Sequence, residues 1–129
     1  MRKLKVMLCF LVFSLGAIGQ TLLSPGDLLL VTVNADGSDN FDFVPLADIA
    51  SGTVINFTDN AWITAGGALN SNEGILVYTA SGSVTKGTVV SYPGSTGGEW
   101  ASGGGSFTIA AAGDNILVYQ GLSSSPDFI

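Results

Sequence analysis

Beyond residue 20, the apolar residues of this chain come in seven short runs, each bounded by Gly, Asn, Asp, Ser or Pro. The runs are rich in Val, Ile, Leu, Phe, Tyr and Thr, which favour β-strands. Short strands repeated at this spacing are typical of an antiparallel sandwich or barrel, and we predict an all-β, antiparallel β-sandwich of about seven strands. The runs are DLLLVTV (27–33), FDFVPL (41–46), TVINFT (53–58), GILVYTA (74–80), GTVVSY (87–92), SFTIA (106–110) and NILVYQ (115–120).

Two of the runs alternate with the period of a half-buried sheet. Phe41 and Phe43 share one face of their strand, and Ile55 and Phe57 share one face of theirs, because successive strand side chains point to opposite sides. These four side chains are expected in the core. The residues expected on the opposite, wetter faces are Asp42, Val44, Val54, Asn56 and Thr58.

Other runs depart from this alternation. LLLV and ILVY are continuously apolar, which predicts central strands covered on both faces. Pro45 cannot donate a ladder hydrogen bond, so its strand is expected to lie at an edge or to end there. The best helix candidate is VPLADIA (44–50), where Leu46, Ile49 and Ala50 fit one helical turn, and we expect at most a short turn.

Two segments near the C-terminus carry further expectations. The Gly-rich stretch GGEWASGGGSF (97–107) is interpreted as a flexible connection. Phe128 and Ile129 look like the start of another strand, so the chain is expected to be truncated or to be the first module of a longer polypeptide.

The N-terminus has the three-part pattern of a secretory signal peptide. Arg2, Lys3 and Lys5 form a positive head, an apolar stretch follows, and Ala17 and Gly19 stand at the −3 and −1 positions of a cleavage site. The apolar stretch, of about 15 residues, is shorter than the ~20 that a spanning helix needs. We therefore predict a signal peptide at 1–19, a single β-sandwich domain at 20–129, and a secreted or cell-surface location.

Removal of this leader narrows the possible chemistry. The only cysteine, both methionines and three of the four basic residues lie within it, and the chain has no histidine. Residues 20–129 would then hold one lysine and ten acids, which leaves nine net negative charges. Disulfides, thiolate sites and Ser-His-Asp catalysis are excluded from this segment, and its charge argues against nucleic acid and anionic membranes as partners.

The acidic stretch NADGSDNFD (34–42) could be a calcium loop or a tight turn. A helix–loop–helix calcium loop needs Gly at its sixth position and an acid at its twelfth, and a loop starting at Asn34 fails on both counts. A looser calcium site using Asp36, Asp39 and Asp42 stays open. The turn is preferred, because Asp and Gly tolerate positive φ and Asp and Asn bond their own backbone.

No set of catalytic residues emerges from the remaining acids. A glycosidase would need two carboxylates held across a cleft, and nothing in the sequence fixes such a pair. We therefore predict no catalytic, cofactor-binding or metal site, no cofactor and no enzymatic activity, and we expect the acids to be solvated at strand ends. The candidates considered for such a pair are Asp42, Asp48, Asp59, Glu73 and Glu99.

Aromatic residues offer a second kind of site, a stacking surface for sugar. Trp62 is expected to belong to the core or to cap one end of the sandwich, whereas Trp100, in a Gly/Ser-rich loop, is expected to be the better exposed aromatic. Tyr92 is a further candidate. Asn56 opens a glycosylation sequon in the middle of a strand, and we interpret it as a chance match.

From Pro25 to Gly121 the chain resembles a module of secreted bacterial proteins. The segments that carry the resemblance are PGDLLLVTVNADGSDNFDFVPLADIASGTVINFTDNAW, NEGILVYTA, GTVVSY and GDNILVYQG. Such modules are similar to the lamin-tail type of immunoglobulin-like β-sandwich and often stand near the N-terminus of large exported proteins. The resemblance implies this fold and context, and it supplies no catalytic residues.

Three functional hypotheses follow. The leading one is a non-catalytic extracellular module that acts as a spacer, docking surface or adhesion element. Its expected partners are other domains of the same polypeptide, or cell-surface or extracellular polymers. The alternatives are a carbohydrate-binding module using Trp100, Trp62 or Tyr92, and an accessory domain of a secreted nuclease, phosphatase or other hydrolase.

The leader hypothesis predicts a defined mature N-terminus. When the chain is expressed in an export-competent bacterium, mass spectrometry of the secreted product should place Gln20 first, either free or cyclised. An Ala17→Leu variant should accumulate unprocessed, because a large residue at −3 blocks cleavage. Recovery of a product that retains residues 1–19 would contradict the prediction.

Overall fold

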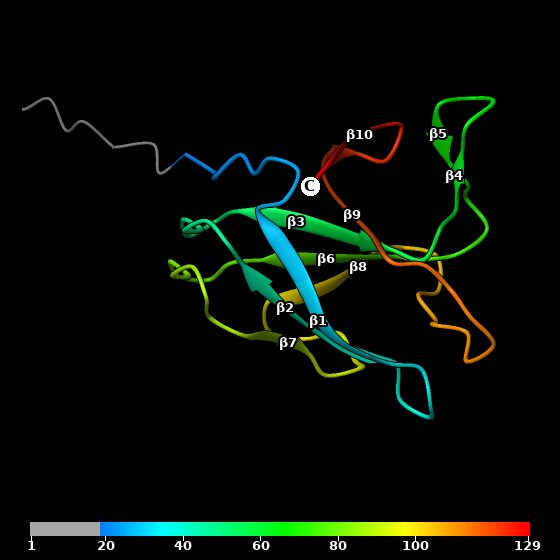
Figure 1. Ribbon diagram of the computed structural model, residues 1–129, viewed down its shortest axis with the longest axis horizontal. Helices are drawn as coiled ribbons and strands as arrows, with labels where there is room; N and C mark the ends of the chain where they lie inside the picture. The colour runs from blue at the N-terminus through cyan, green and yellow to red at the C-terminus, as the bar shows by residue number, and fades with distance from the viewer. Residues whose placement is uncertain (1–18) are drawn as a thin grey trace, which may run out of the picture.

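The computed structural model describes residues 19–129, and these residues form strands and turns without any helix. Two larger antiparallel sheets face each other, and a small two-stranded sheet stands at one end of the molecule (Figure 1). The all-β, antiparallel prediction is therefore confirmed. The expected signal peptide lies outside the described residues, apart from Gly19.

The first sheet has three strands in the order β1-β2-β7, with β1 (Leu28–Asn34), β2 (Asn40–Pro45) and β7 (Val90–Tyr92). The acidic stretch 34–42 forms the β1–β2 hairpin and its loop, so the turn interpretation is confirmed. Gly37 lies in this loop at φ 94°, a left-handed conformation that favours glycine.

The second sheet has five strands in the order β10-β9-β3-β6-β8, and β4 pairs with β5 in the small sheet. All pairings in both sheets are antiparallel. The bounds are β3 (Val54–Thr58), β4 (Trp62–Ile63), β5 (Ala68–Leu69), β6 (Ile75–Thr79), β8 (Trp100–Gly104), β9 (Leu117–Leu122) and β10 (Ser125–Phe128).

Six of the seven apolar runs contain a strand, and the prediction for SFTIA (106–110) is wrong. Three backbone N–H groups of this run bond to carboxylates instead of to a neighbouring strand, and one of them is Ala110 N, which donates to Asp114 Oδ2 at 2.9 Å. Thr108 N donates to Asp59 Oδ2 at 2.8 Å, and Ile109 N donates to Asp39 Oδ2 at 3.0 Å. Side-chain acceptors thus take the place of a ladder here.

The Gly-rich segment 97–107 was expected to be a flexible connection, and that expectation is wrong because it contains β8. Its glycines permit a close approach to β6. A Cβ added at Gly103 would lie 2.8 Å from Ile75 Cγ2, and one added at Gly105 would collide with the Glu73 carbonyl. Gly103 thus permits close packing within the sheet, and Gly105, just after β8, permits it against the turn before β6.

The segment 44–50 contains no helical turn, which agrees with the expectation of at most a short turn. Its backbone donors bond to distant segments: Leu46 N donates to Asp27 O at 2.7 Å, and Ile49 N donates to Val84 O at 2.8 Å. Pro45 is the last residue of β2, which confirms one of the two positions expected for it. Phe128 ends β10, so a strand does lie in this segment.

The expected wet face of β3 is buried. Asn56 is 8% exposed and Thr58 is fully buried, which contradicts the alternation. The segment before β1 bonds to Gln120 of β9, an interior strand of this sheet. Gln120 accepts from Leu23 N at 2.8 Å, and its side-chain amide donates to the carbonyls of Thr21 and Val54 at 3.0 Å each.

The continuously apolar runs behave differently from one another. β6 and β9 lie inside the five-stranded sheet, as expected. In β9 Val118 and Tyr119 are both buried, as expected for a strand covered on two sides, whereas β6 alternates half-buried and buried residues. β1 contradicts the expectation, because it is an edge strand whose Leu29, Val31 and Val33 are 51%, 44% and 52% exposed.

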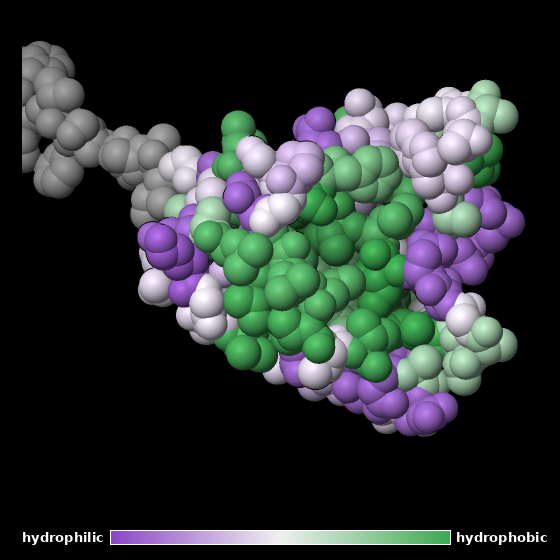
Figure 2. Space-filling view, viewed as in Figure 1, coloured by the Kyte–Doolittle hydropathy of each residue, from purple (hydrophilic) through white to green (hydrophobic). Residues whose placement is uncertain are grey.

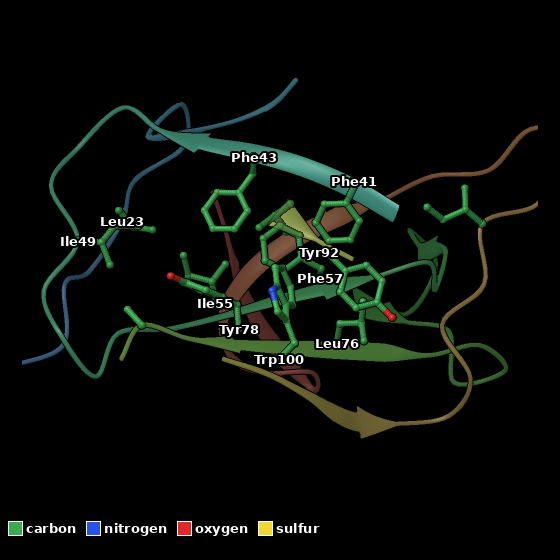
Figure 3. Packing of buried hydrophobic residues seen from close by; sticks show 13 residues of the cluster. Leu23, Phe41, Phe43, Ile49, Ile55, Phe57, Leu76, Tyr78, Tyr92 and Trp100 are labelled. Carbon is green, nitrogen blue, oxygen red and sulfur yellow. The ribbon is translucent and has the colours of Figure 1, made fainter. Parts of the chain in front are cut away.

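The core lies between β2–β7 of one sheet and β3–β6–β8 of the other, as Figure 3 shows. Trp100 is at its centre, with ring centroids 5.0–6.3 Å from the rings of five aromatic neighbours. Its indole N–H donates to Ser91 O at 3.0 Å, so its one polar group is satisfied. The five neighbours are Phe41, Phe43, Phe57, Tyr78 and Tyr92.

This packing predicts a large cost for truncating a central ring. Phe57→Ala should lower the free energy of unfolding by about 3–5 kcal/mol, because Phe57 is fully buried between Phe41 and Trp100. Leu122→Ala, at a side chain that is 72% exposed, should change it by less than about 0.5 kcal/mol. Urea unfolding followed by tryptophan fluorescence measures both, and similar costs at the two positions would refute this description of the core.

Candidate functional site

The aromatic side chains expected to stack on sugar are placed differently from the prediction. Trp100 and Tyr92 are each 6% exposed and belong to the core, so the expectation that Trp100 is the better exposed tryptophan is wrong. Trp62 is 38% exposed and packs edge-on against Phe128, with centroids 5.1 Å apart. The contact with Phe128 fits the expected capping role for Trp62.

The three acids of the hairpin have separate partners. Asp39 accepts from the backbone of Ile109, whereas Asp42 accepts from Thr32 Oγ1 at 2.6 Å. Hydrogen bonds from the hydroxyls of Ser91 and Thr32 lower the pKa of the Asp42 carboxyl. Asp36 is exposed, and its backbone N–H donates to Asn34 Oδ1 at 3.0 Å. Among residues 19–129, no three His, Cys, Asp or Glu side chains gather into a group that could hold a metal.

Asp59 is the one fully buried acid among the candidates for a catalytic pair. It is 1% exposed, and its two oxygens accept from Gly74 N at 2.7 Å and Thr108 N at 2.8 Å. The neighbouring Asn60, 3% exposed, accepts from Glu73 N at 3.0 Å. Both side chains therefore hold loops together by satisfying backbone donors.

The other candidate acids also bond to backbone N–H groups or face solvent. Asp48 accepts from Lys86 N at 2.8 Å, and Glu99 accepts from the N–H and the hydroxyl of Ser81 at 2.7 Å each. Glu73 is exposed and lines a hollow of about 430 Å³ together with Asn60. The structure does not bring a second candidate acid into the lining of this hollow.

Asn56, the sequon asparagine, is almost buried in β3. Its side-chain amide donates to the carbonyl of Gly121 at 3.3 Å. This position leaves no access for a glycan in the folded domain, and the interpretation as a chance match is consistent with it.

An open groove lined by apolar residues lies between β1 and the β9–β10 side of the second sheet, and it is called the seam groove below. Its volume is about 440 Å³. Figure 2 shows apolar surface gathered in the middle of this face of the molecule. The lining residues are Leu28, Leu29, Leu30, Ile116, Leu117, Val118, Phe128 and Ile129.

An irregularity in β1 lies just beyond the residues that line the seam groove. The β1–β2 register shifts between Leu30 and Thr32, which leaves Val31 without a partner. After this bulge, Val33 lies opposite the buried Phe41 and so shares its inward face. Val33 is nevertheless 52% exposed, because the second sheet does not cover this end of β1.

The outer edge of β1 presents unpaired main-chain groups. β1 is the outermost strand of its sheet, and its ladder partner is β2. Within residues 19–129, no backbone hydrogen bond outside this ladder involves residues 28–34. An apolar groove and an edge able to pair with another strand thus adjoin.

Sequence reasoning missed the seam groove. A signal was present in LLLV and ILVY. Their continuous apolar character was interpreted as evidence that other parts of the same chain cover both faces of these strands. The run LLLV lies at an edge, and the ILVY run at 116–119 supplies Ile116, Leu117 and Val118 to the opposite wall. Hydropathy alone does not separate these two situations.

No family model, curated protein or solved structure matched the chain. The likeness to lamin-tail-type modules therefore stays a proposal. In the part of the chain that the structure describes, no helix is long and apolar enough to cross a membrane.

Tyr78 has a buried hydroxyl that finds no hydrogen-bond partner among the described residues. Burial, followed by the negative charge of Glu99, raises the pKa of Tyr78 to about 12. Because this value exceeds the unfolded value of about 10, the contribution of the neutral tyrosine to stability is complete below pH 10 and is lost as the pH rises towards 12.

Tyr78→Phe should therefore reduce the fall in stability between pH 10 and 12. At pH 7 it should leave stability unchanged or raise it slightly, since it removes a buried group without a partner. Urea unfolding at pH 7, 10 and 11 compares the variant with the parent. Greater alkaline sensitivity in the variant would show that the hydroxyl has a stabilising partner.

Proposed function

We propose that residues 20–129 form a non-catalytic module of a secreted or cell-surface protein, which binds its partner through the seam groove. The observation that carries this proposal is the coincidence of an apolar groove with the unpaired edge of β1. Exposed apolar patches bounded by polar surface are typical of interaction sites, and edge strands recruit other strands. The signal-peptide pattern at 1–19 supports the compartment.

The resemblance to lamin-tail-type modules of exported bacterial proteins is compatible with this role. A docking element within a larger polypeptide, or between a polypeptide and a cell-surface partner, needs a surface and no reactive group. The candidate acids support the same proposal, because Asp39, Asp48, Asp59 and Glu99 accept hydrogen bonds from backbone donors.

A carbohydrate-binding role has less support. Two of the three aromatic side chains considered for it, Trp100 and Tyr92, are core residues. Trp62 is partly exposed, but one of its edges is engaged with Phe128. A single partly exposed ring offers a small stacking area compared with the seam groove.

Binding of Nile red, a neutral apolar dye, tests whether the seam groove is an accessible site. The folded protein should enhance the dye's fluorescence, and Leu30→Lys should reduce the enhancement by more than about half, because Leu30 lies opposite the buried Phe43 and a charged side chain there would enter the groove. Val89→Lys is the matched control, since Val89 is 59% exposed and lies outside the groove.

Near-UV circular dichroism should show that both variants stay folded. The Val89→Lys variant should bind the dye as the parent does. Equal dye binding by all three proteins would refute the seam groove as the binding surface, and with it the proposed function.

A further inference from the structure

We infer that the partner of the seam groove is an extended segment with alternating apolar side chains and basic residues at both ends, which adds a strand to the edge of β1. This inference rests on the proposed function and specifies its partner. It follows from three properties of this region. The outer edge of β1 has unpaired main-chain groups, the second sheet does not cover all the inward side chains, and acidic residues lie at both ends of β1.

The main chain decides the conformation of the partner. β1 offers seven residues with an unpaired outer edge, a length of about 23 Å at the usual strand rise. Only an extended chain can bond to alternate N–H and carbonyl groups along such an edge. A helix or a compact loop would leave these groups unpaired while covering them.

The side chains decide the pattern of the partner. A strand placed beside β1 would point every second side chain inward, towards the second sheet. There it would meet Ile116, Val118 and Ile129 on the far wall, and it would cover the exposed flank of Val33. The alternate side chains would face solvent, so the fitting sequence alternates apolar and polar residues.

The charges at the two ends of β1 determine which residues should stand at the ends of the partner segment. Asp27 immediately precedes β1 and Asp36 lies two residues after it, while Lys86 is the only basic residue beyond residue 20. Lysine or arginine at each end of the added strand would meet one of these carboxylates.

The same charges disfavour a second copy of this chain as the partner. Antiparallel pairing of two β1 strands would bring Asp27 of each copy near Asp36 of the other. Parallel pairing would bring each of these acids near its own equivalent. Both arrangements set like charges side by side between two strongly acidic chains, which opposes association.

Three synthetic peptides test the inference by isothermal titration calorimetry at low salt. The first has a core of alternating Thr and Val with Lys at both ends, and the second has the same core with Glu at both ends. The third keeps the Lys ends but replaces the central Val with Pro, which removes a main-chain donor.

The Lys-ended peptide should bind, and the Glu-ended peptide should bind about tenfold more weakly, a difference that shrinks as salt is added. The Pro-containing peptide should not bind measurably. Leu30→Lys should abolish binding of the first peptide, whereas Val89→Lys should leave its affinity within about threefold. Hydrogen exchange should show slower exchange of amides within residues 28–34 when the first peptide is bound.

Other outcomes would overturn the inference. Equal affinity for the Lys-ended and Glu-ended peptides would remove the charge requirement, and undiminished binding of the Pro-containing peptide would remove strand pairing. Dimerisation with protected β1 amides, measured by analytical ultracentrifugation and exchange, would assign the edge to a second copy. If no peptide binds but Nile red still distinguishes Leu30→Lys from Val89→Lys, the inference fails while the proposed function stands.

Discussion

The contacts of Trp100 with aromatic rings from both sheets hold the two layers of this domain together. Phe41, Phe43 and Tyr92 reach it from the first sheet, and Phe57 and Tyr78 reach it from the second. The chain has a single cysteine, so no disulfide within it can stabilise the domain. Aromatic pairs of this kind add about 0.5–1.5 kcal/mol each beyond the burial of their area. The orientation of the sheets therefore depends on this cluster.

Because the cluster sits over β2, β7, β3, β6 and β8, it leaves one side of the sandwich unfilled. The edge strand β1 lies on that side, facing the β9–β10 hairpin across the seam groove. Leu28 and Leu30 line the groove and pack against the margin of the core, but they are not among the rings around Trp100. The proposed binding thus depends on residues outside the aromatic cluster, and a groove variant can be compared with the parent in the folded state.

The acids of this chain serve the fold in a way that its composition does not reveal. Asp59 and Asp39 accept backbone N–H groups of residues 108 and 109, and Asp48 and Glu99 accept those of residues 86 and 81. A carboxylate oxygen is a strong acceptor, so these bonds fix loops that no ladder reaches. The acids of the chain therefore have two roles. Some of them fix loops, and others place negative charge at the two ends of β1.

The sequence by itself determined the all-β class, six of the strands, the hairpin at 34–42 and the inward faces of Phe41, Phe43, Ile55 and Phe57. These depend on local properties: strand period, turn residues and the spacing of apolar runs. The tertiary structure alone decided that Trp100 is buried, that the glycines after it form β8, and that the apolar β1 lies at an open edge. Each of these depends on which segments distant in the chain become neighbours, because exposure is set by what packs against a residue and not by its own hydropathy.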